Sequence, residues 1–319
     1  MSNQFFSEAL VNQIQNKKSY ICIGLDPNFD GVKCIPKHLL EENQHDFTKA
    51  ILEFNKAIID KTHRITPVYK LQSAFYEKYF AYDAIKLTIN HIHSLGGLAI
   101  LDAKRNDIGN TAKAYAISVF DNYKADAVTV NSYLGIDGIK PFMEYEGKGI
   151  FALVKTSNKS SGQFQDLFAT KLDAELGQMT LDITGSTTLK RNYMHMAELV
   201  NSWAQEGQIK RGYSGMGAVV GATYPNELKE LRRIMPHSFI LIPGYGAQGG
   251  TAKAVVNGIN PDGYGAIVNS SRGIDYAYVK EIAGKHFTSE EFAEASLEAA
   301  EIMRMEINDA IEKQNLLPW

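Results

Sequence analysis

The sequence has few cysteines, little net charge and no long hydrophobic run, and each shortage excludes a class of protein. Only two of its 319 residues are cysteines. Cys22 and Cys34 lie in or beside an apolar run and lack the spacing of metal ligands, so we expect reduced, buried thiols. The polar start Met1-Ser2-Asn3-Gln4 lacks the apolar core of a signal peptide and favours a cytoplasmic location.

The formal net charge is only −3 at pH 7. With so little excess charge there is no long-range attraction for polyanions, so we expect neither nucleic acid nor an anionic membrane as a partner. No apolar run approaches the roughly 18 residues that span a bilayer. Any anionic ligand must therefore be held by particular residues.

The chain also lacks internal repeats, low-complexity tracts and Pro- or Ser-rich linkers, which favours a single domain over residues 1–319. Short runs rich in Ile, Val and Leu alternate with longer segments of helical period. Eight runs predict strands: Tyr20–Leu25, Val68–Leu71, Leu98–Asp102, Ala127–Val130, Ile150–Val154, Met216–Val220, Phe239–Ile242 and Ala266–Val268. Because eight parallel strands close a barrel, we predict an α/β fold, a (β/α)8 TIM barrel.

The predicted helices present one apolar stripe each. Apolar residues follow helical spacing over 47–58 and over 85–95, and Gly96-Gly97 ends the second helix. The stretch from about 159 to 211 is too long for one βα connection and contains an amphipathic piece, Tyr193–Ala204, so we expect an insertion after strand five. Residues 289–313 predict an extra C-terminal helix.

Three charged residues cluster at the end of the third predicted strand. In an extended strand, side chains two apart point the same way, so Asp102 and Lys104 should project together while Ala103 faces the other side. Asp107 follows in the loop. Because barrel enzymes place their catalytic groups at this end of the strands, the cluster is a candidate active site, although a structural ion pair would use the same residues.

The segment around this cluster, Leu101-Asp102-Ala103-Lys104-Arg105-Asn106-Asp107-Ile108-Gly109-Asn110-Thr111-Ala112, closely resembles the signature of orotidine 5′-phosphate decarboxylases. Further matches occur in order after other strands: Gly24-Leu25-Asp26-Pro27-Asn28, Tyr69-Lys70-Leu71-Gln72, Lys155-Thr156-Ser157-Asn158, Pro243-Gly244-Tyr245-Gly246-Ala247-Gln248-Gly249-Gly250 and Asn269-Ser270-Ser271-Arg272-Gly273. The resemblance spans the barrel and is greatest to the longer, type 2-like branch. Gln72 departs from it, since some members have a smaller amide there.

The resemblance implies decarboxylation of orotidine 5′-phosphate to UMP and CO2 in pyrimidine biosynthesis, without cofactor or metal. Lys104 would donate the proton to C6, held by Asp102 and Asp107, with Lys70 between Asp102 and the ribose. Substrate-binding roles would fall to Asp26, Thr156, Ser157, Gln248, Gly249, Arg272 and Gly273. The resemblance also implies a homodimer with shared sites, in which Asp107, Ile108 and Thr111 reach into the neighbouring barrel.

The residues themselves support part of this interpretation. Gln248, the backbone at Gly249-Gly250 and Arg272 follow strands seven and eight, where barrels form phosphate sites from N–H groups and a cationic side chain. Gly244-x-Gly246-x-x-Gly249 also matches a dinucleotide fingerprint, but Asp262 lies before the next strand, where it cannot bind a ribose in the manner of that motif.

Three alternatives remain open. A Schiff-base aldolase could use Lys70, Lys104 or Lys155 on the same barrel, although the carboxylates beside Lys104 would keep its amine protonated. A Mg2+-dependent sugar-phosphate decarboxylase could use the same Asp-x-Lys motif, but it gives no reason for Thr156, Ser157 and Gln248. A phosphate-binding barrel without turnover would keep Arg272 but has no need of the Lys104 cluster.

Overall fold

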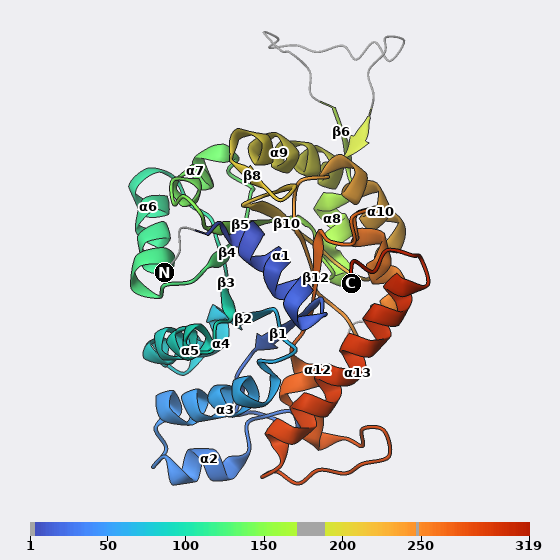
Figure 1. Cartoon of the computed structure of the whole chain (residues 1–319). Coiled ribbons are helices and arrows are strands. Elements are labelled where there is room, and N and C mark those ends of the chain that lie inside the picture. The colour runs from blue at the N-terminus through green and yellow to red at the C-terminus, as the bar shows by residue number, and fades with distance from the viewer. Residues whose placement is uncertain (1–3, 171–188, 247–248) are drawn as a thin grey trace.

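Eight parallel strands form a closed barrel, in agreement with the sequence (Figure 1). The computed structural model describes residues 4–170, 189–246 and 249–319. The barrel strands are β1 (Ile21–Leu25), β2 (Val68–Gln72), β3 (Leu98–Arg105), β4 (Ala127–Val130), β5 (Gly149–Lys155), β10 (Met216–Val220), β11 (Ile240–Ile242) and β12 (Ala266–Ser270). Their order around the barrel follows the chain, and β12 closes it by pairing with β1.

The strands are buried on both faces, which explains why they read as continuous apolar runs. Every residue of β1, β4, β10, β11 and β12 is buried. The one marked irregularity in β3 is a register shift against β4 between Leu101 and Arg105. This irregularity falls on the predicted catalytic residues.

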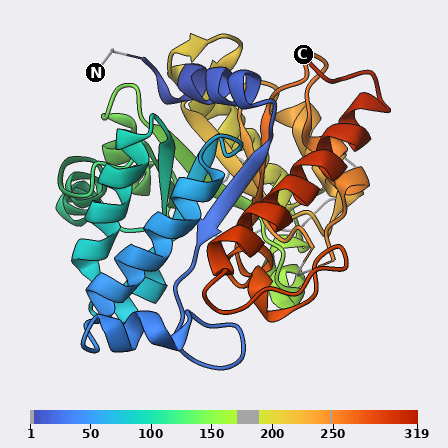
Figure 2. The ribbon, with the colours of Figure 1, turned by 60° about the horizontal axis from the view of Figure 1, so that its bottom comes forward.

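Helices cover the outside of the barrel (Figures 1 and 2). The helices in the described part of the chain are α1 (Phe6–Lys17), α2 (Lys37–Glu42), α3 (Phe47–Thr62), α4 (Ser73–Lys78), α5 (Tyr82–Ser94), α6 (Gly109–Ile117), α7 (Lys140–Met143), α8 (Gly162–Gln165), α9 (Asn192–Glu206), α10 (Pro225–Ile234), α11 (Ala252–Val255), α12 (Arg272–Asp275) and α13 (Phe292–Glu312). Both expected amphipathic helices are present as α3 and α5, and Gly96 follows α5 with a φ of +72°. No helix in the described part of the chain is long and apolar enough to cross a bilayer.

One end of the barrel is closed by α1. Its Phe6 packs edge to face on Phe151, with ring centroids 6.0 Å apart. A Cβ atom on Gly149 would lie 2.3 Å from the Phe6 ring, so only glycine allows this close approach. Since α1 covers the end at which β1 begins, the opposite end remains for the site (Figure 2).

The chain between β5 and β10 is longer than the other connections. It contains α8, the antiparallel pair β6 (Phe168–Ala169) and β7 (Lys190–Arg191), helix α9, and the pair β8 (Ile209–Lys210) and β9 (Tyr213–Ser214). Helix α9, which the sequence placed inside the insertion, packs against β5, β10 and α10. It therefore occupies the position of the ordinary barrel helix after strand five. The sequence could not show this position, because an amphipathic pattern does not indicate which strands or helices the apolar face packs against.

The extra C-terminal helix is α13, which packs along α3, α11 and α12 (Figure 2). Its buried residues include Phe292, Met303 and Ile307. Of the two free cysteines, Cys22 is buried as expected, whereas Cys34 is only partly buried.

Candidate active site

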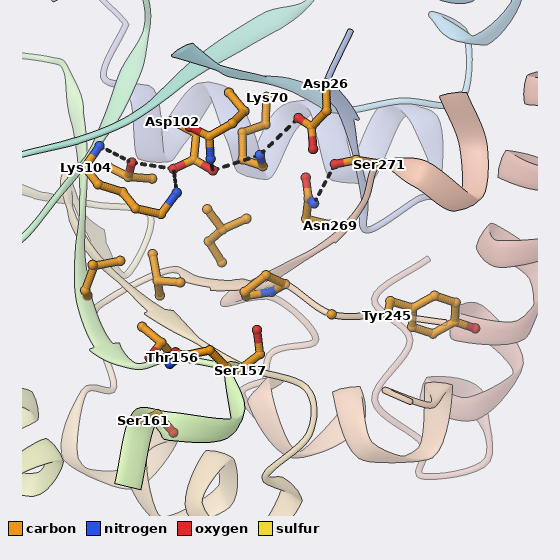
Figure 3. A pocket seen from close by; sticks show the side chains of 18 of the residues that line it. Asp26, Lys70, Asp102, Lys104, Thr156, Ser157, Ser161, Tyr245, Asn269 and Ser271 are labelled. Atoms are coloured by element: carbon orange, nitrogen blue, oxygen red, sulfur yellow. Dashed lines mark hydrogen bonds and ion pairs between the residues drawn. The ribbon is translucent and has the colours of Figure 1, made fainter. Parts of the chain in front are cut away.

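A cavity of about 680 Å3 opens at the carboxyl ends of the barrel strands. Its walls come from segments far apart in the sequence: Asp26, Lys70, Gln72, Asp102, Lys104, Thr129, Leu153, Thr156–Asn158, Ser160, Ser161, Gln163–Gln165, Val219, Leu241, Pro243–Tyr245 and Asn269–Arg272. Figure 3 shows the charged residues on one side and Thr156 and Ser157 on the facing side. The cavity thus brings together most of the residues that the sequence singled out.

Asp102 is the centre of the charged side. Its Oδ1 accepts hydrogen bonds from Lys104 Nζ at 2.7 Å and from Thr129 Oγ1 at 2.7 Å. Its Oδ2 accepts from Lys70 Nζ at 2.9 Å and from Gln72 Nε2 at 3.1 Å. Four donors on one carboxylate fix its position, so Asp102 holds both lysines on this side of the cavity (Figure 3).

The charges on this side stabilise one another. Burial opposes the charge on Lys70, but the Asp102 and Asp26 carboxylates outweigh it and raise the pKa of Lys70. Burial likewise opposes the charge on Asp102, yet Lys70 and Lys104 hold the pKa of Asp102 well below its usual range. Asp102 and Lys70 are therefore ionised at neutral pH. The Lys104 side chain is 43% exposed and lines the cavity.

Lys104 reaches the cavity by a different backbone path from the one predicted. The prediction that Asp102 and Lys104 project together is confirmed by their hydrogen bond, but β3 is not regularly extended at Lys104, because the φ of this residue is +46° and the strand changes register there. The Lys104 N–H donates to Thr129 Oγ1 at 3.1 Å, which holds this left-handed turn in place. A lysine in this region is strained, and the strain is offset by contacts at a site where its side chain must point inward.

Two residues of this cluster carried no prediction of a role. Thr129 is a buried polar residue within the apolar strand β4, and it contacts both Asp102 and the Lys104 backbone. Gln72, noted only as a departure from the family pattern, also contacts Asp102. The sequence does show Thr129 as a polar residue inside an apolar strand, which could have marked it as a candidate site residue. Its partners depend on strand pairing, which the sequence does not give.

Asp26 lies beside Lys70, with the Oδ1 atom 3.9 Å from the Lys70 Nζ. This Oδ1 is buried, and it accepts no hydrogen bond within the described residues. Behind it, the Asp26 N–H donates to Asp275 Oδ2 at 3.1 Å, and Tyr276 OH donates to the Asp26 carbonyl at 2.7 Å. Burial, reinforced by the nearby Asp26 charge, raises the pKa of Asp275. Asp26 therefore presents an acceptor to the cavity from a fixed backbone.

Among the expected phosphate-binding residues that the structure describes, only Arg272 lines the cavity. Arg272 lines it at the start of α12, next to Gly273. Gly249 is exposed in the loop after β11 with a φ of +89°, a conformation that favours glycine. Gln248 lies outside the described residues.

The side facing the lysines follows β5. Thr156 and Ser157 line the cavity there, and Ser157 points into it in Figure 3. Lys155, a Schiff-base candidate, is completely buried and donates to Asp166 Oδ1 at 2.7 Å. Its side chain is therefore directed away from any ligand.

Five of the expected residues that the structure describes do not line this cavity: Gly249 and Gly273, and the three that follow β3, Asp107, Ile108 and Thr111. Asp107 is partly exposed and accepts a hydrogen bond from the N–H of the next residue, Ile108, at 2.8 Å. Ile108 is 57% exposed, and Thr111 is also exposed. The structure therefore separates these residues from Asp102 and Lys104 of the same chain. In the described residues, no group of three or more His, Cys, Asp or Glu side chains is arranged to hold a metal.

Comparison with known proteins identifies the family. The model of the Orotidine 5′-phosphate decarboxylase / HUMPS family matches residues 19–285. Orotidine 5′-phosphate decarboxylase of Rhodopirellula baltica is 38% identical over 289 residues, which cover 86% of this chain and 90% of that protein. The enzyme of the same name from Halobacterium salinarum is 36% identical, covering 95% of this chain and 98% of the relative.

A solved structure agrees. The Leishmania donovani OMP decarboxylase superposes with a TM-score of 0.71 at 30% identity, over 96% of this chain and 99% of that one. The matched residues 19–285 include every barrel strand and the whole charged cluster. The chain belongs to the orotidine 5′-phosphate decarboxylase / HUMPS family.

Proposed function

We propose that this site decarboxylates orotidine 5′-phosphate to UMP and CO2, with Lys104 as the proton donor. The observation that carries the proposal is the array of Lys70, Asp102 and Lys104 on the charged side of the cavity, where Asp102 fixes both ammonium groups. Relatives that bear the name orotidine 5′-phosphate decarboxylase, and the family model that matches the whole barrel, support the choice of substrate.

The proposed reaction breaks the bond between C6 and the carboxylate carbon and leaves the electron pair on C6. No carbonyl or imine is placed to absorb that charge, so the protein must stabilise it electrostatically. Lys104, held by Asp102 at 2.7 Å, supplies a positive charge beside the developing carbanion. It then gives one proton to C6 to form UMP, and regains a proton from water.

Repulsion of the substrate carboxylate is the smaller contribution. Two like charges about 4 Å apart repel by about 4 kcal/mol at an effective dielectric near 20. Enzymes commonly lower barriers by roughly 8 to 23 kcal/mol. Most of the effect must therefore come from the preorganised Lys104 charge, and from phosphate binding that is expressed in the transition state.

The other cavity residues fit the remaining parts of the substrate. Asp26 Oδ1 suits a ribose hydroxyl, because it is a buried acceptor without a described hydrogen-bond donor. Arg272, together with N–H groups at Gly249 and Gly273, suits the phosphate. Thr156 and Ser157 are assigned to the pyrimidine, which places the base between them and Lys104.

The direct test is to incubate the purified chain with orotidine 5′-phosphate. We expect stoichiometric CO2 release together with loss of the orotate absorbance and formation of UMP. Borohydride should trap no covalent adduct on Lys104, since its proton and not its lone pair is used. Absence of CO2 release from an active, folded preparation would overturn the proposal.

We also propose that two chains form a dimer with shared active sites. Asp107, Ile108 and Thr111 lie outside the cavity of their own chain, and Ile108 exposes 57% of its surface, as a residue awaiting a partner would. A two-fold axis near the loop after β3 would carry Asp107 into the neighbouring barrel.

Complementation tests the shared site. Lys104→Ala and Asp107→Ala should each be inactive, and refolding them together should restore activity. In the mixed dimer one site would carry both lesions and the other neither. Verified heterodimers without recovered activity would exclude sharing and leave the decarboxylase proposal intact.

A further inference from the structure

The segment after β5 turns back on itself, and Gln165 closes the turn. Gln165 is the last residue of α8 and lines the cavity. The Thr156 N–H donates to Gln165 Oε1 at 3.0 Å, and Gln165 Nε2 donates to Thr156 Oγ1 at 2.7 Å. Because a backbone N–H can only donate, the amide oxygen must face it, and the side-chain orientation follows from this contact.

These contacts occupy the donors of Thr156. Its hydroxyl, which accepts from Gln165, donates its hydrogen to Asn158 Oδ1 at 2.6 Å. A threonine hydroxyl has one hydrogen, and a residue has one backbone N–H. With both already donated, Thr156 has no hydrogen for a carbonyl oxygen of the base. Donation to the base therefore falls to the next residue, Ser157.

Ser157 is held from the other side by Gly221. The Gly221 N–H donates to the Lys155 carbonyl at 2.8 Å. A Cβ atom on Gly221 would lie 2.9 Å from Ser157 Cβ and 3.0 Å from its Cα, so the two backbones are in close contact. Ser157 is thus placed between Gly221 and the hydrogen-bonded turn, with its hydroxyl directed into the cavity (Figure 3).

An ion pair between the buried Lys155 and the partly exposed Asp166 holds the segment next to Gln165. Its neighbour Asp166 accepts from Lys155 Nζ at 2.7 Å, and the Lys155 side chain is only 1% exposed. Lys155 also lies 4.6 Å from the centre of the Tyr224 ring. Two adjacent residues therefore hold the segment in place. Asp166 binds Lys155, the last residue of β5, and Gln165 binds Thr156, the residue after it.

We propose that Gln165 is a positioning residue for recognition of the pyrimidine. By fixing the Thr156 peptide and hydroxyl, it orients Ser157 to donate to a carbonyl oxygen of the base. This inference rests on the proposed function, since it assigns the base to this side of the cavity. Gln165 acts through Thr156, while Asp26 and Arg272 lie on other edges of the cavity.

The test compares two ligands that differ in the base. UMP carries pyrimidine, ribose and phosphate, whereas ribose 5-phosphate lacks the pyrimidine. In Gln165→Met, which keeps the side-chain length but removes both hydrogen bonds, calorimetry should show UMP affinity reduced about tenfold or more, with ribose 5-phosphate affinity within about twofold of wild type. Gln165→Glu, whose carboxylate can accept from the Thr156 N–H and hydroxyl, should recover most of the UMP affinity.

The matched control is Gln208→Met, which removes one hydrogen bond, to Glu146, on an exposed surface outside the cavity. It should bind both ligands as the wild type does. An equal loss of affinity for UMP and ribose 5-phosphate in Gln165→Met, or an unchanged UMP affinity, would overturn the inference. A wild-type chain that neither binds UMP nor releases CO2 from orotidine 5′-phosphate would instead overturn the proposed function.

Discussion

The two sides of the cavity differ in how their side chains are held. On the charged side, Lys70, Asp102 and Thr129 come from three neighbouring barrel strands, and Asp102 contacts the other two across long sequence separations. On the facing side, Thr156 is held by Gln165, only nine residues further along the chain. The charged side is mostly buried, and the facing side is partly exposed.

This difference suggests that the two sides of the cavity have different functions. Charges that must act in the transition state need fixed positions and low solvent access, which strand ends provide. Groups that select a ligand can lie on a connecting segment, where a local hydrogen-bonded turn is enough. We therefore assign the chemistry to the strand ends and recognition of base and phosphate to the loops.

The largest expected effect is at Lys104. Lys104→Ala removes both the stabilising charge and the proton donor, so turnover of orotidine 5′-phosphate should fall by at least about 10⁴-fold. The fold should persist, because this side chain is 43% exposed. Steady-state kinetics with circular dichroism as the folding control checks this. A variant retaining a tenth of wild-type turnover would end the assignment of Lys104.

Asp102 tests whether the charged side is one unit. Asp102→Asn leaves the buried Lys70 ammonium without its principal partner, so the free energy of unfolding should fall by about 3 to 5 kcal/mol. Urea denaturation measures the loss. Thr156→Ala, at a partly exposed site, should cost about 1 kcal/mol. Similar losses in the two variants would remove the contrast between the two sides.

Arg272 tests the phosphate edge. Arg272→Ala should lower kcat/KM for orotidine 5′-phosphate, with a loss of transition-state stabilisation of about 2 to 3 kcal/mol. The reason is that a phosphate contact remote from C6 is used to stabilise the transition state. Orotidine, which lacks the phosphate, should react equally with both enzymes. If the variant handles the phosphorylated substrate normally, the phosphate binds elsewhere.

The pH dependence of the unfolding free energy tests whether the Asp102 and Lys70 charges stabilise the fold. A carboxylate whose folded pKa is depressed, such as Asp102, contributes stability above its unfolded value of about 3.9 and loses it as the pH falls. Lys70, whose folded pKa is raised, contributes fully below its unfolded value of about 10.4. The difference in unfolding free energy between wild type and Asp102→Asn should therefore be constant from about pH 5 to 9, and shrink below about pH 4. A change across neutral pH would show that another group dominates.

The smallest expected effect is that of chelation. If Lys104 supplies the positive charge, exhaustive treatment with EDTA should leave kcat unchanged within error. Added Mg2+ should likewise have no effect. Activity that is lost with EDTA and restored by Mg2+ would favour the sugar-phosphate decarboxylase alternative.

The barrel could be predicted because its strands are buried on both faces and therefore read as short apolar runs. Each of the eight predicted runs overlaps an observed strand, and the ends differ by at most a few residues. The same logic located Asp102 and Lys104, since polar residues directly after such runs lie at one end of the barrel.

Contacts that depend on strand pairing, turns and packing could not be predicted from the sequence. Thr129 contacts Asp102 because strand pairing places β4 beside β3. Gln165 is only nine residues from Thr156, but their contact depends on a turn that no local residue pattern specifies. The left-handed backbone at Lys104 depends on a register shift that no local residue pattern specifies. The position of α9 on the barrel wall also depended on packing rather than on its own periodicity.

The division between chemistry and recognition is tested most directly by measuring UMP affinity in Lys104→Ala and Arg272→Ala. UMP has no carboxylate at C6, so it reports recognition without the reaction. We expect calorimetry to show affinity within about threefold of wild type for Lys104→Ala, and at least about tenfold weaker binding for Arg272→Ala. Parallel losses in both variants, or a larger loss in Lys104→Ala, would contradict the account.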